Sequence, residues 1–127
     1  MVRDEEFFRS ITEQIIGSAY KVGNCLGTGF LEKVYENAMF YEVSKSGLKV
    51  QQQYPINVFY ENLVVGEYFA DLLVEDEVVV ELKAVKSLEP IHFAQCMNYL
   101  KATGKKVGLL INFGASKVEI RRVVNSL

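Results

Sequence analysis

The sequence predicts an α/β fold: a central mixed β-sheet flanked by helices. From Phe8 to Leu26, apolar residues recur in steps of three and four, which is typical of an amphipathic helix. Later in the chain lie short runs of Val, Ile, Leu and Tyr, which are typical of strands in a well-covered sheet. The 127 residues are enough for one domain with a real core, so we expect residues 1–127 to form a single unit.

Three helices are expected, at about residues 5–26, 30–46 and 88–103. Gly47 and Gly104 follow the second and third of them, where a C-terminal cap is expected. A proline in the first turn of the third helix is tolerated there.

Most of the remaining chain has strand character. Pro55 is expected to separate the first two strand segments, and a turn is expected at Glu61 and Asn62. The nearly continuous apolar run before Gly114 predicts a strand that is covered on both faces. The expected strand segments are 50–54, 56–60, 64–74, 78–85 and 107–113, with 118–124 as a strand or a short helix.

Composition narrows the class of protein. Half of the residues are hydrophobic, which argues against disorder, and no apolar run approaches the ~18 residues of a membrane span. The N-terminus is too acidic for a signal peptide, so we expect a cytoplasmic protein with no membrane partner. Cys25 and Cys96 lack C-x-x-C spacing and are expected to be two buried, reduced thiols.

Charge is distributed unevenly along the chain. The net charge of −2 argues weakly against an obligate nucleic-acid binder, yet residues 83–127 hold 8 basic and only 2 acidic side chains. A basic C-terminal third can form a local patch for phosphates, although ordinary solvated surface is the alternative. The candidate nucleic-acid-binding residues are Lys101, Lys105, Lys106, Lys117, Arg121 and Arg122.

Two carboxylates and an ammonium interrupt a pair of otherwise apolar strands. A hairpin with a three-residue turn, Glu75 to Glu77, places Asp71 opposite Glu81 and puts Lys83 on the same face. The other face then contains only Leu and Val, whereas a two-residue turn leaves neither face cleanly apolar. Like charges that oppose each other in a sheet are destabilising, so something must neutralise them.

Two converging carboxylates beside a lysine fit metal-assisted hydrolysis of a phosphodiester. Mg²⁺ prefers carboxylate and carbonyl oxygens, lowers the pKa of a water molecule and offsets charge on the phosphate. A nearby ammonium can orient that water or stabilise the developing oxyanion. The carbonyl of Leu82, between Glu81 and Lys83, is expected to point towards the same ion. The alternative is a polar, solvent-facing end of the sheet with a Lys–Glu pair.

Two helical stretches add polar side chains at helical spacing. Glu32 and Glu36 lie four residues apart, an arrangement of like charges that costs about 0.3 kcal/mol. An exposed acidic edge is the alternative, and it is the preferred interpretation for Glu36. His92, Gln95 and Tyr99 fall on one helical stripe, which is either part of a site or a polar border. His92 has no second histidine with which to chelate a metal.

These segments resemble the GxxExxY protein family, a branch of the PD-(D/E)XK nuclease superfamily. The naming motif is Gly29 to Tyr35, and the superfamily signature is similar to Asp71 followed by Glu81-Leu82-Lys83. Ala70 stands where the signature has its proline, a position at which many members vary.

Two further motifs extend the resemblance over roughly residues 5–124. The residues from Gln95 to Tyr99 are similar to the Q-x-x-x-Y motif of RecB-like nucleases, and Gly108 to Gly114 matches the C-terminal pattern of the family. The resemblance implies a restriction-endonuclease-like core.

The resemblance also implies a site and an activity. The activity is Mg²⁺- or Mn²⁺-dependent cleavage of nucleic acid, with DNA favoured over RNA. Cutting would be structure-selective or weakly sequence-specific, because no second domain is expected to read bases. A homodimer is compatible with this, since one copy covers little duplex. The implied metal ligands are Asp71, Glu81, the carbonyl of Leu82, and Glu32 as an auxiliary acid. The implied catalytic residues are Lys83, Asp71, Glu81, Glu32, Gln95 and Tyr99.

Two other functions stay open. One is a non-catalytic nucleic-acid-binding or assembly module on the same fold, and the intact set of Asp71, Glu81 and Lys83 argues against it. The other is a metal-dependent hydrolase of a nucleotide or another small phosphate ester, which a deep closed pocket would favour over an open basic groove.

Overall fold

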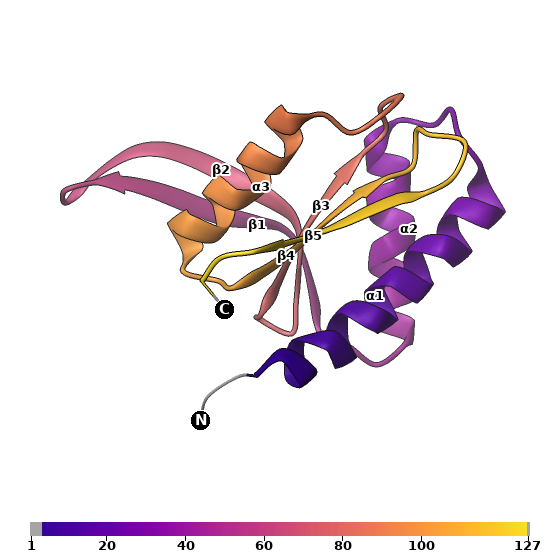
Figure 1. Ribbon diagram of the computed structural model, residues 1–127, viewed down its shortest axis with the longest axis horizontal. Coiled ribbons are helices and arrows are strands. Elements are labelled where there is room, and N and C mark those ends of the chain that lie inside the picture. The colour runs from indigo at the N-terminus through magenta and orange to yellow at the C-terminus, as the bar shows by residue number, and fades with distance from the viewer. Residues whose placement is uncertain (1–3, 127) are drawn as a thin grey trace.

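The computed structural model describes residues 4–126, which form a five-stranded sheet with helices on both faces (Figure 1). The expected α/β architecture is confirmed. The strands follow sequence order across the sheet, and only β3 and β4 are parallel to each other, with α3 as their crossover connection. The elements are α1 (Glu5–Leu26), α2 (Glu32–Lys45), β1 (Val50–Tyr60), β2 (Leu63–Val74), β3 (Val78–Lys83), α3 (Pro90–Thr103), β4 (Val107–Asn112) and β5 (Glu119–Val124).

Each face of the sheet has its own hydrophobic core. On one face, α1 and α2 pack against the even-numbered residues of β2 and β3, among them Leu72 and Val80. On the other face, α3 packs against Leu73 and Val79. The predicted sorting of this strand pair into a purely apolar face and a second face is therefore confirmed. All six residues of β4 are buried, which confirms that it is covered on both faces.

The boundaries of the first two helices follow from the chain around their ends. The Asp4 carboxylate caps α1 by accepting the backbone N–H of Phe7 at 2.9 Å. α2 begins at Glu32, two residues later than expected, because Gly29 has a φ of 109° and Leu31 is still extended.

α3 begins at Pro90 and ends before Gly104, whose φ of 75° terminates it as predicted. His92 has a structural task in its first turn. The Nδ1 atom of His92 accepts the backbone N–H of Glu89 at 2.9 Å, which caps the helix.

The first two predicted strand segments are one strand. Pro55 lies inside β1 and not between two strands, and it is tolerated because β1 is an edge strand that can lack one donor. The expected turn at Glu61 and Asn62 joins β1 to β2. The last expected element, written as a strand or a short helix, is the strand β5.

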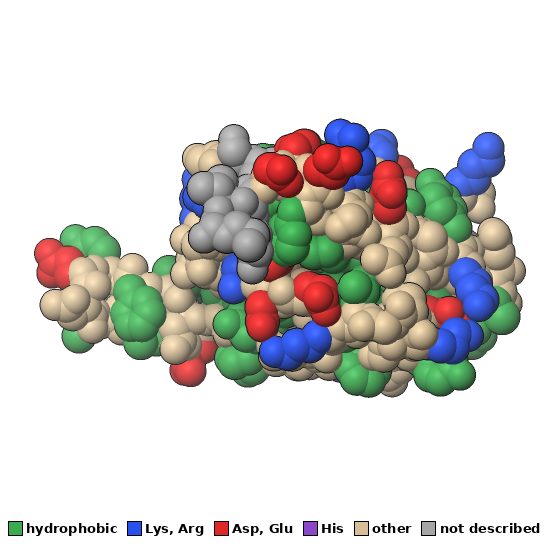
Figure 2. Space-filling view, turned by 90° about the horizontal axis from the view of Figure 1, so that it is seen from below, with side chains coloured by type: hydrophobic (Ala, Val, Ile, Leu, Met, Phe, Trp, Pro, Cys, Tyr) green, Lys and Arg blue, Asp and Glu red, His purple; other side chains and the backbone are tan. Residues whose placement is uncertain are grey.

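The β1–β2 hairpin projects from the body at its turn end, and we call residues 54–69 the arm (Figures 1 and 2). The base of the arm, with Tyr54 and the buried Ile56, packs in the core below α3. Figure 2 shows hydrophobic side chains on this projecting part. Its exposed large hydrophobic residues are Phe59, Tyr60, Leu63, Val64, Val65, Tyr68 and Phe69.

The end of β4 is tied to the segment that follows β3. The buried Asn112 side chain accepts the N–H groups of Val85 and Gly114, at 2.9 and 3.0 Å. It also donates to the carbonyl of Val85 at 2.9 Å and to Glu119 at 2.8 Å. Gly114 lies so close that an added Cβ would be 2.3 Å from the carbonyl oxygen of Val85. These contacts explain the Asn and the final Gly of the Gly108–Gly114 motif.

We expect Gly114→Ala to lower the free energy of unfolding by about 1–3 kcal/mol, because the new methyl group overlaps backbone atoms that cannot rotate away. Gly17→Ala is the matched control. Gly17 lies within α1 with nothing within 4 Å of an added Cβ, so this change should stabilise the protein by about 0.5–1 kcal/mol. Urea denaturation measures both changes, and effects of the same sign would contradict this packing.

The two cysteines differ from each other. Cys96 is buried as expected, and burial raises the pKa of its thiol to about 12. Cys25 is exposed, so its predicted burial is wrong: the next residue, Leu26, takes the position that packs against the core. Within residues 4–126, no helix is long and apolar enough to cross a membrane.

Candidate active site

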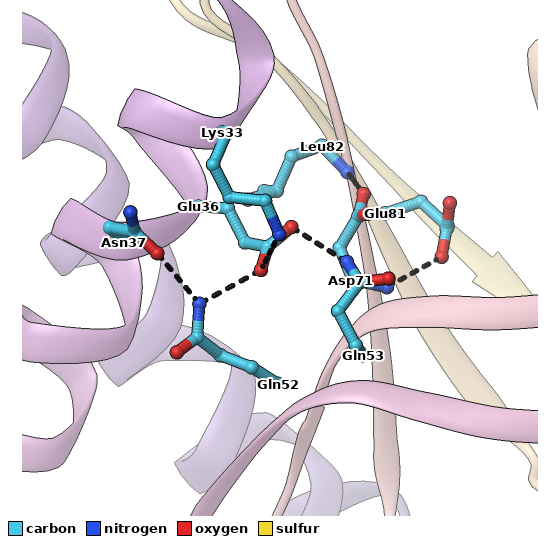
Figure 3. A network of polar contacts seen from close by, with 8 residues as sticks. All are labelled: Lys33, Glu36, Asn37, Gln52, Gln53, Asp71, Glu81 and Leu82. Carbon is cyan, nitrogen blue, oxygen red and sulfur yellow. Dashed lines mark hydrogen bonds and ion pairs between the residues drawn. The ribbon is translucent and has the colours of Figure 1, made fainter.

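β2 and β3 separate at the point where Asp71 faces Glu81. Their ladder runs from the three-residue turn up to Leu72 opposite Val80, which confirms the predicted register. Beyond it, the Asp71 N–H donates to Glu81 Oε1 at 3.1 Å and the Leu82 N–H donates to Asp71 Oδ2 at 2.7 Å. Each carboxylate thus bonds the backbone of the opposite strand (Figure 3). From this point β2 continues into the arm, and we call the place the fork.

The two fork carboxylates destabilise each other's charge. Burial raises the pKa of Glu81 to about 8, and the neighbouring Asp71 charge adds to this shift. Burial also raises the pKa of Asp71 to about 6, against the hydrogen bond from the Leu82 N–H, which favours the charged form. Charges on Glu36 and Glu32 raise the pKa of Asp71 further. Without a cation, burial and the neighbouring charges therefore disfavour having both acids ionised at once.

Lys83 is held beside the acids by a chain of side chains from α3. Its Nζ donates to Gln95 Oε1 at 2.9 Å, and Gln95 Nε2 donates to the Tyr99 hydroxyl at 3.2 Å. The charge of Lys83 lowers the pKa of both Asp71 and Glu81, so the ammonium lies close to the fork. The structure therefore brings together Asp71, Glu81, Lys83, Gln95 and Tyr99.

The Gly29–Tyr35 motif serves mainly to fix the loop between α1 and α2. The Tyr35 ring is fully buried and stacks on Phe113 with ring centroids 4.7 Å apart. The Tyr35 hydroxyl donates to the Gly27 carbonyl at 2.6 Å. Glu32, in the first turn of α2, is exposed, but its charge raises the pKa of both fork acids.

Glu36 is buried, so the preferred interpretation of this residue as part of an exposed acidic edge is wrong. It is not on an exposed edge: it is 4% exposed and accepts hydrogen bonds from Lys33 at 3.0 Å and from Gln52 and Gln53 at 2.8 Å each (Figure 3). The reason is that the backbone of β1 departs from regular strand geometry at Gln53, which has a φ of 50° and no partner in the β1–β2 ladder, although the register is the same on both sides of it. The run of three glutamines at the start of β1 is the signal that pointed to a buried polar partner.

We expect Glu36→Ala to lower the free energy of unfolding by about 1–3 kcal/mol, because three donors lose a buried acceptor. Glu32→Ala, one turn earlier on α2 and exposed, should change it by less than about 0.5 kcal/mol. Urea denaturation compares the two variants. Equal changes in the free energy of unfolding would show that the hydrogen bonds of Glu36 do not stabilise the fold.

The fork suits a hard divalent cation with few protein ligands. Among residues 4–126, no group of three or more His, Cys, Asp or Glu side chains is arranged to hold a metal. The fork offers two carboxylates, and within the described chain no donor bonds the second oxygen of either one, Asp71 Oδ1 or Glu81 Oε2. Mg²⁺ keeps several waters and binds proteins through one or two carboxylates, so this donor set fits it.

The raised pKa values predict how the metal-free protein responds to pH. Both fork acids bind protons more tightly when folded, so the folded state holds more protons between about pH 4 and about pH 8. Thermal stability in chelator should therefore fall as the pH rises through this window. Glu81→Gln should flatten the fall, whereas Glu67→Gln, on the exposed arm, should not. A wild-type melting temperature that rises steadily from pH 5 to pH 8 would contradict these assignments.

The six basic residues proposed for nucleic acid are spread over the C-terminal third. They occupy α3, the turn after it, the β4–β5 loop and β5. Arg121 and Arg122 are neighbours in a strand and so project to opposite faces, and Arg122 is ion-paired with Glu5. Lys101 is the one that lies beside Gln95 and Tyr99, in the lining of a common groove.

A mixed sheet with helices on both faces, and two acids and a lysine where two adjacent strands separate, defines a nuclease-like α/β domain. The chain belongs to the PD-(D/E)XK nuclease superfamily, whose family model matches residues 9–123. A search among curated proteins finds no match.

Two solved structures have a similar fold. One is an alkaline exonuclease (LHK-Exo) from Laribacter hongkongensis, with a TM-score of 0.56 and 13% identity over 99% of this chain and 73% of that one. The other is the crystal structure of SSO0001, with a TM-score of 0.55 and 13% identity over 76% of this chain and 51% of that one. At such identities the likeness concerns the fold alone.

Proposed function

We propose that this protein hydrolyses nucleic-acid phosphodiester bonds at the fork with the help of Mg²⁺ or Mn²⁺. One observation carries the proposal. The carboxylates of Asp71 and Glu81 each accept a backbone N–H from the other's strand, and each keeps one oxygen without a donor among the described residues. Lys83 is held beside them by Gln95. Two buried, mutually repelling acids are costly unless a cation binds between them.

Each residue of the fork has a proposed role. Asp71 and Glu81 hold the cation, with the Leu82 carbonyl as a further oxygen ligand and Glu32 as an auxiliary acid on α2. Bound there, the cation would lower the pKa of water and offset charge on the phosphate. Lys83 donates hydrogen bonds to the phosphoryl oxygens as their negative charge grows in the transition state.

Gln95 and Tyr99 are positioning residues. Gln95 accepts from Lys83 and donates to Tyr99, so the lysine is kept on the fork side of α3. A lysine that is already oriented loses less side-chain freedom when it meets the phosphate.

Finer assignments follow from the sequence resemblance and form part of the proposal. The chain fits the GxxExxY branch with RecB-like features, acting on DNA in preference to RNA. Weak sequence specificity fits a single small domain, and a homodimer would let two forks act on one duplex. A cytoplasmic location suits such a substrate.

A substrate panel tests the proposal. Labelled single-stranded, duplex and branched DNA and RNA are incubated with the protein in Mg²⁺, in Mn²⁺ and in chelator. We expect shortened products in metal and none in chelator. Tight binding without cleavage under every condition would instead favour the assembly module, and cleavage of nucleotides alone would favour a small-ester hydrolase.

A further inference from the structure

A groove runs between α3 and the base of the arm, with a volume of about 780 Å³. Its wall on the arm includes Phe59 and Tyr68, and its wall on α3 includes Gln95, Tyr99 and Lys101. Figure 1 shows α3 lying alongside the β1–β2 hairpin, which is the arrangement that forms the groove. We call it the α3 groove.

The lining of the α3 groove includes the rings of Phe59, Tyr68 and Tyr99 and, among the described residues, no carboxylate. Phe59 is 59% exposed and Tyr68 is 48% exposed, so two ring systems are available to a ligand. The only charged or titratable groups in the lining besides tyrosine are Lys101 and His92. The chain has a net charge of −2, so a groove lined without an acid stands out as a place for an anionic ligand. The exposed rings suit a ligand that is also flat.

The α3 groove is lined by the same two residues, Gln95 and Tyr99, that hold Lys83 beside the fork. The Tyr68 ring contacts the Tyr99 ring with centroids 5.7 Å apart. Tyr99 accepts from Gln95, and Gln95 accepts from Lys83. A ligand in the groove therefore lies against the side chains that hold Lys83, the residue that we propose meets the phosphate.

We propose that the α3 groove binds an unpaired stretch of nucleic acid next to the bond that is cut, with bases stacked on Tyr68 and Phe59 and phosphates near Lys101. This inference rests on the proposed function, because it names the kind of substrate that reaches the same site. Aromatic side chains stack on every kind of base, so the groove is tolerant of sequence.

Duplex nucleic acid fits the α3 groove poorly. In a duplex the faces of the bases are covered by their neighbours, and the outer surface presents phosphates and the edges of bases. Exposed rings gain little from such a surface, whereas an unpaired strand offers the flat faces that they can cover. The enzyme is thus predicted to act on single strands, frayed ends or flaps.

Fluorescence anisotropy in chelator tests the groove without any cleavage. The probes are a labelled thymidine oligonucleotide of about 12 nucleotides, an abasic oligonucleotide of the same length and a duplex. We expect the thymidine strand to bind at least about tenfold more tightly than the abasic strand. Tyr68→Ala and Phe59→Ala should each remove most of this preference and leave abasic binding unchanged. Tyr60→Ala, on the same arm but outside the groove lining, is the matched control and should change nothing.

The binding experiment can refute the groove without refuting the proposed cleavage, and the reverse also holds. Equal binding of thymidine and abasic strands by the wild type would overturn the groove even if the protein cleaves DNA, and that comparison needs no variant to fold. Preference for thymidine that Tyr68→Ala abolishes would support the groove even if no cleavage is seen. Variants that change the sedimentation of the protein and leave the thymidine preference intact would overturn the proposal in favour of an interface between two copies.

Discussion

Lys83→Ala should lower the rate of cleavage by on the order of a hundredfold or more, while metal and nucleic-acid binding stay close to those of the wild type. In the proposed mechanism the ammonium acts on charge that develops only in the transition state, so its loss would affect the rate more than the affinity. Single-turnover cleavage and anisotropy binding, measured on the same labelled strand, separate the two effects.

Lys86→Ala is the matched control for this substitution. Lys86 lies three residues further along the chain and is exposed, so its loss should leave the rate within about twofold. A Lys83→Ala protein that cuts as fast as the wild type would refute the catalytic role of the lysine, even though the fold stands.

Millimolar Mg²⁺ or Mn²⁺ should raise the melting temperature of the wild type by roughly 5–10 °C over that in chelator. In the proposed site the cation would remove the repulsion between Asp71 and Glu81 and would bind only the folded state, so mass action would stabilise the protein. The effect should be larger at pH 8 than at pH 5, because metal must compete with protons for acids whose pKa values are raised.

Asp71→Asn and Glu81→Gln should each abolish the metal-induced shift and the cleavage. Both variants should also melt higher than the wild type in chelator at pH 8, because one of two repelling charges is gone. Glu67→Gln, on the exposed arm, should keep the full metal-induced shift. An unchanged wild-type melting temperature across millimolar Mn²⁺ would show that the fork organises no cation site.

The fork could be predicted from sequence because it depends on which residues of two paired strands share a face of the sheet. Side chains alternate along a strand, so the demand for one apolar face selected the odd turn and set Asp71 opposite Glu81. The stripe of Gln95 and Tyr99 followed in the same way from helical spacing. These residues depend on local periodicity, which a sequence displays directly.

Other features could not be predicted because they depend on irregular backbone. The positive φ at Gln53 turns two glutamines towards Glu36 on α2, and nothing in a strand pattern marks where such a residue falls. The continuity of β1 through Pro55 depends on its place at the edge of the sheet, which is a tertiary fact. The α3 groove likewise exists only because the arm and the helix meet in space.

The proposed function depends above all on a cation that binds between Asp71 and Glu81 at the fork. Anomalous scattering from a crystal of the wild-type protein grown in Mn²⁺ locates that ion most directly. One strong manganese peak bonded to both carboxylates is expected, and it should be lost in Asp71→Asn crystals treated in the same way. Manganese bound only elsewhere, or a fork without any peak at saturating Mn²⁺, would show that no cation binds between these acids.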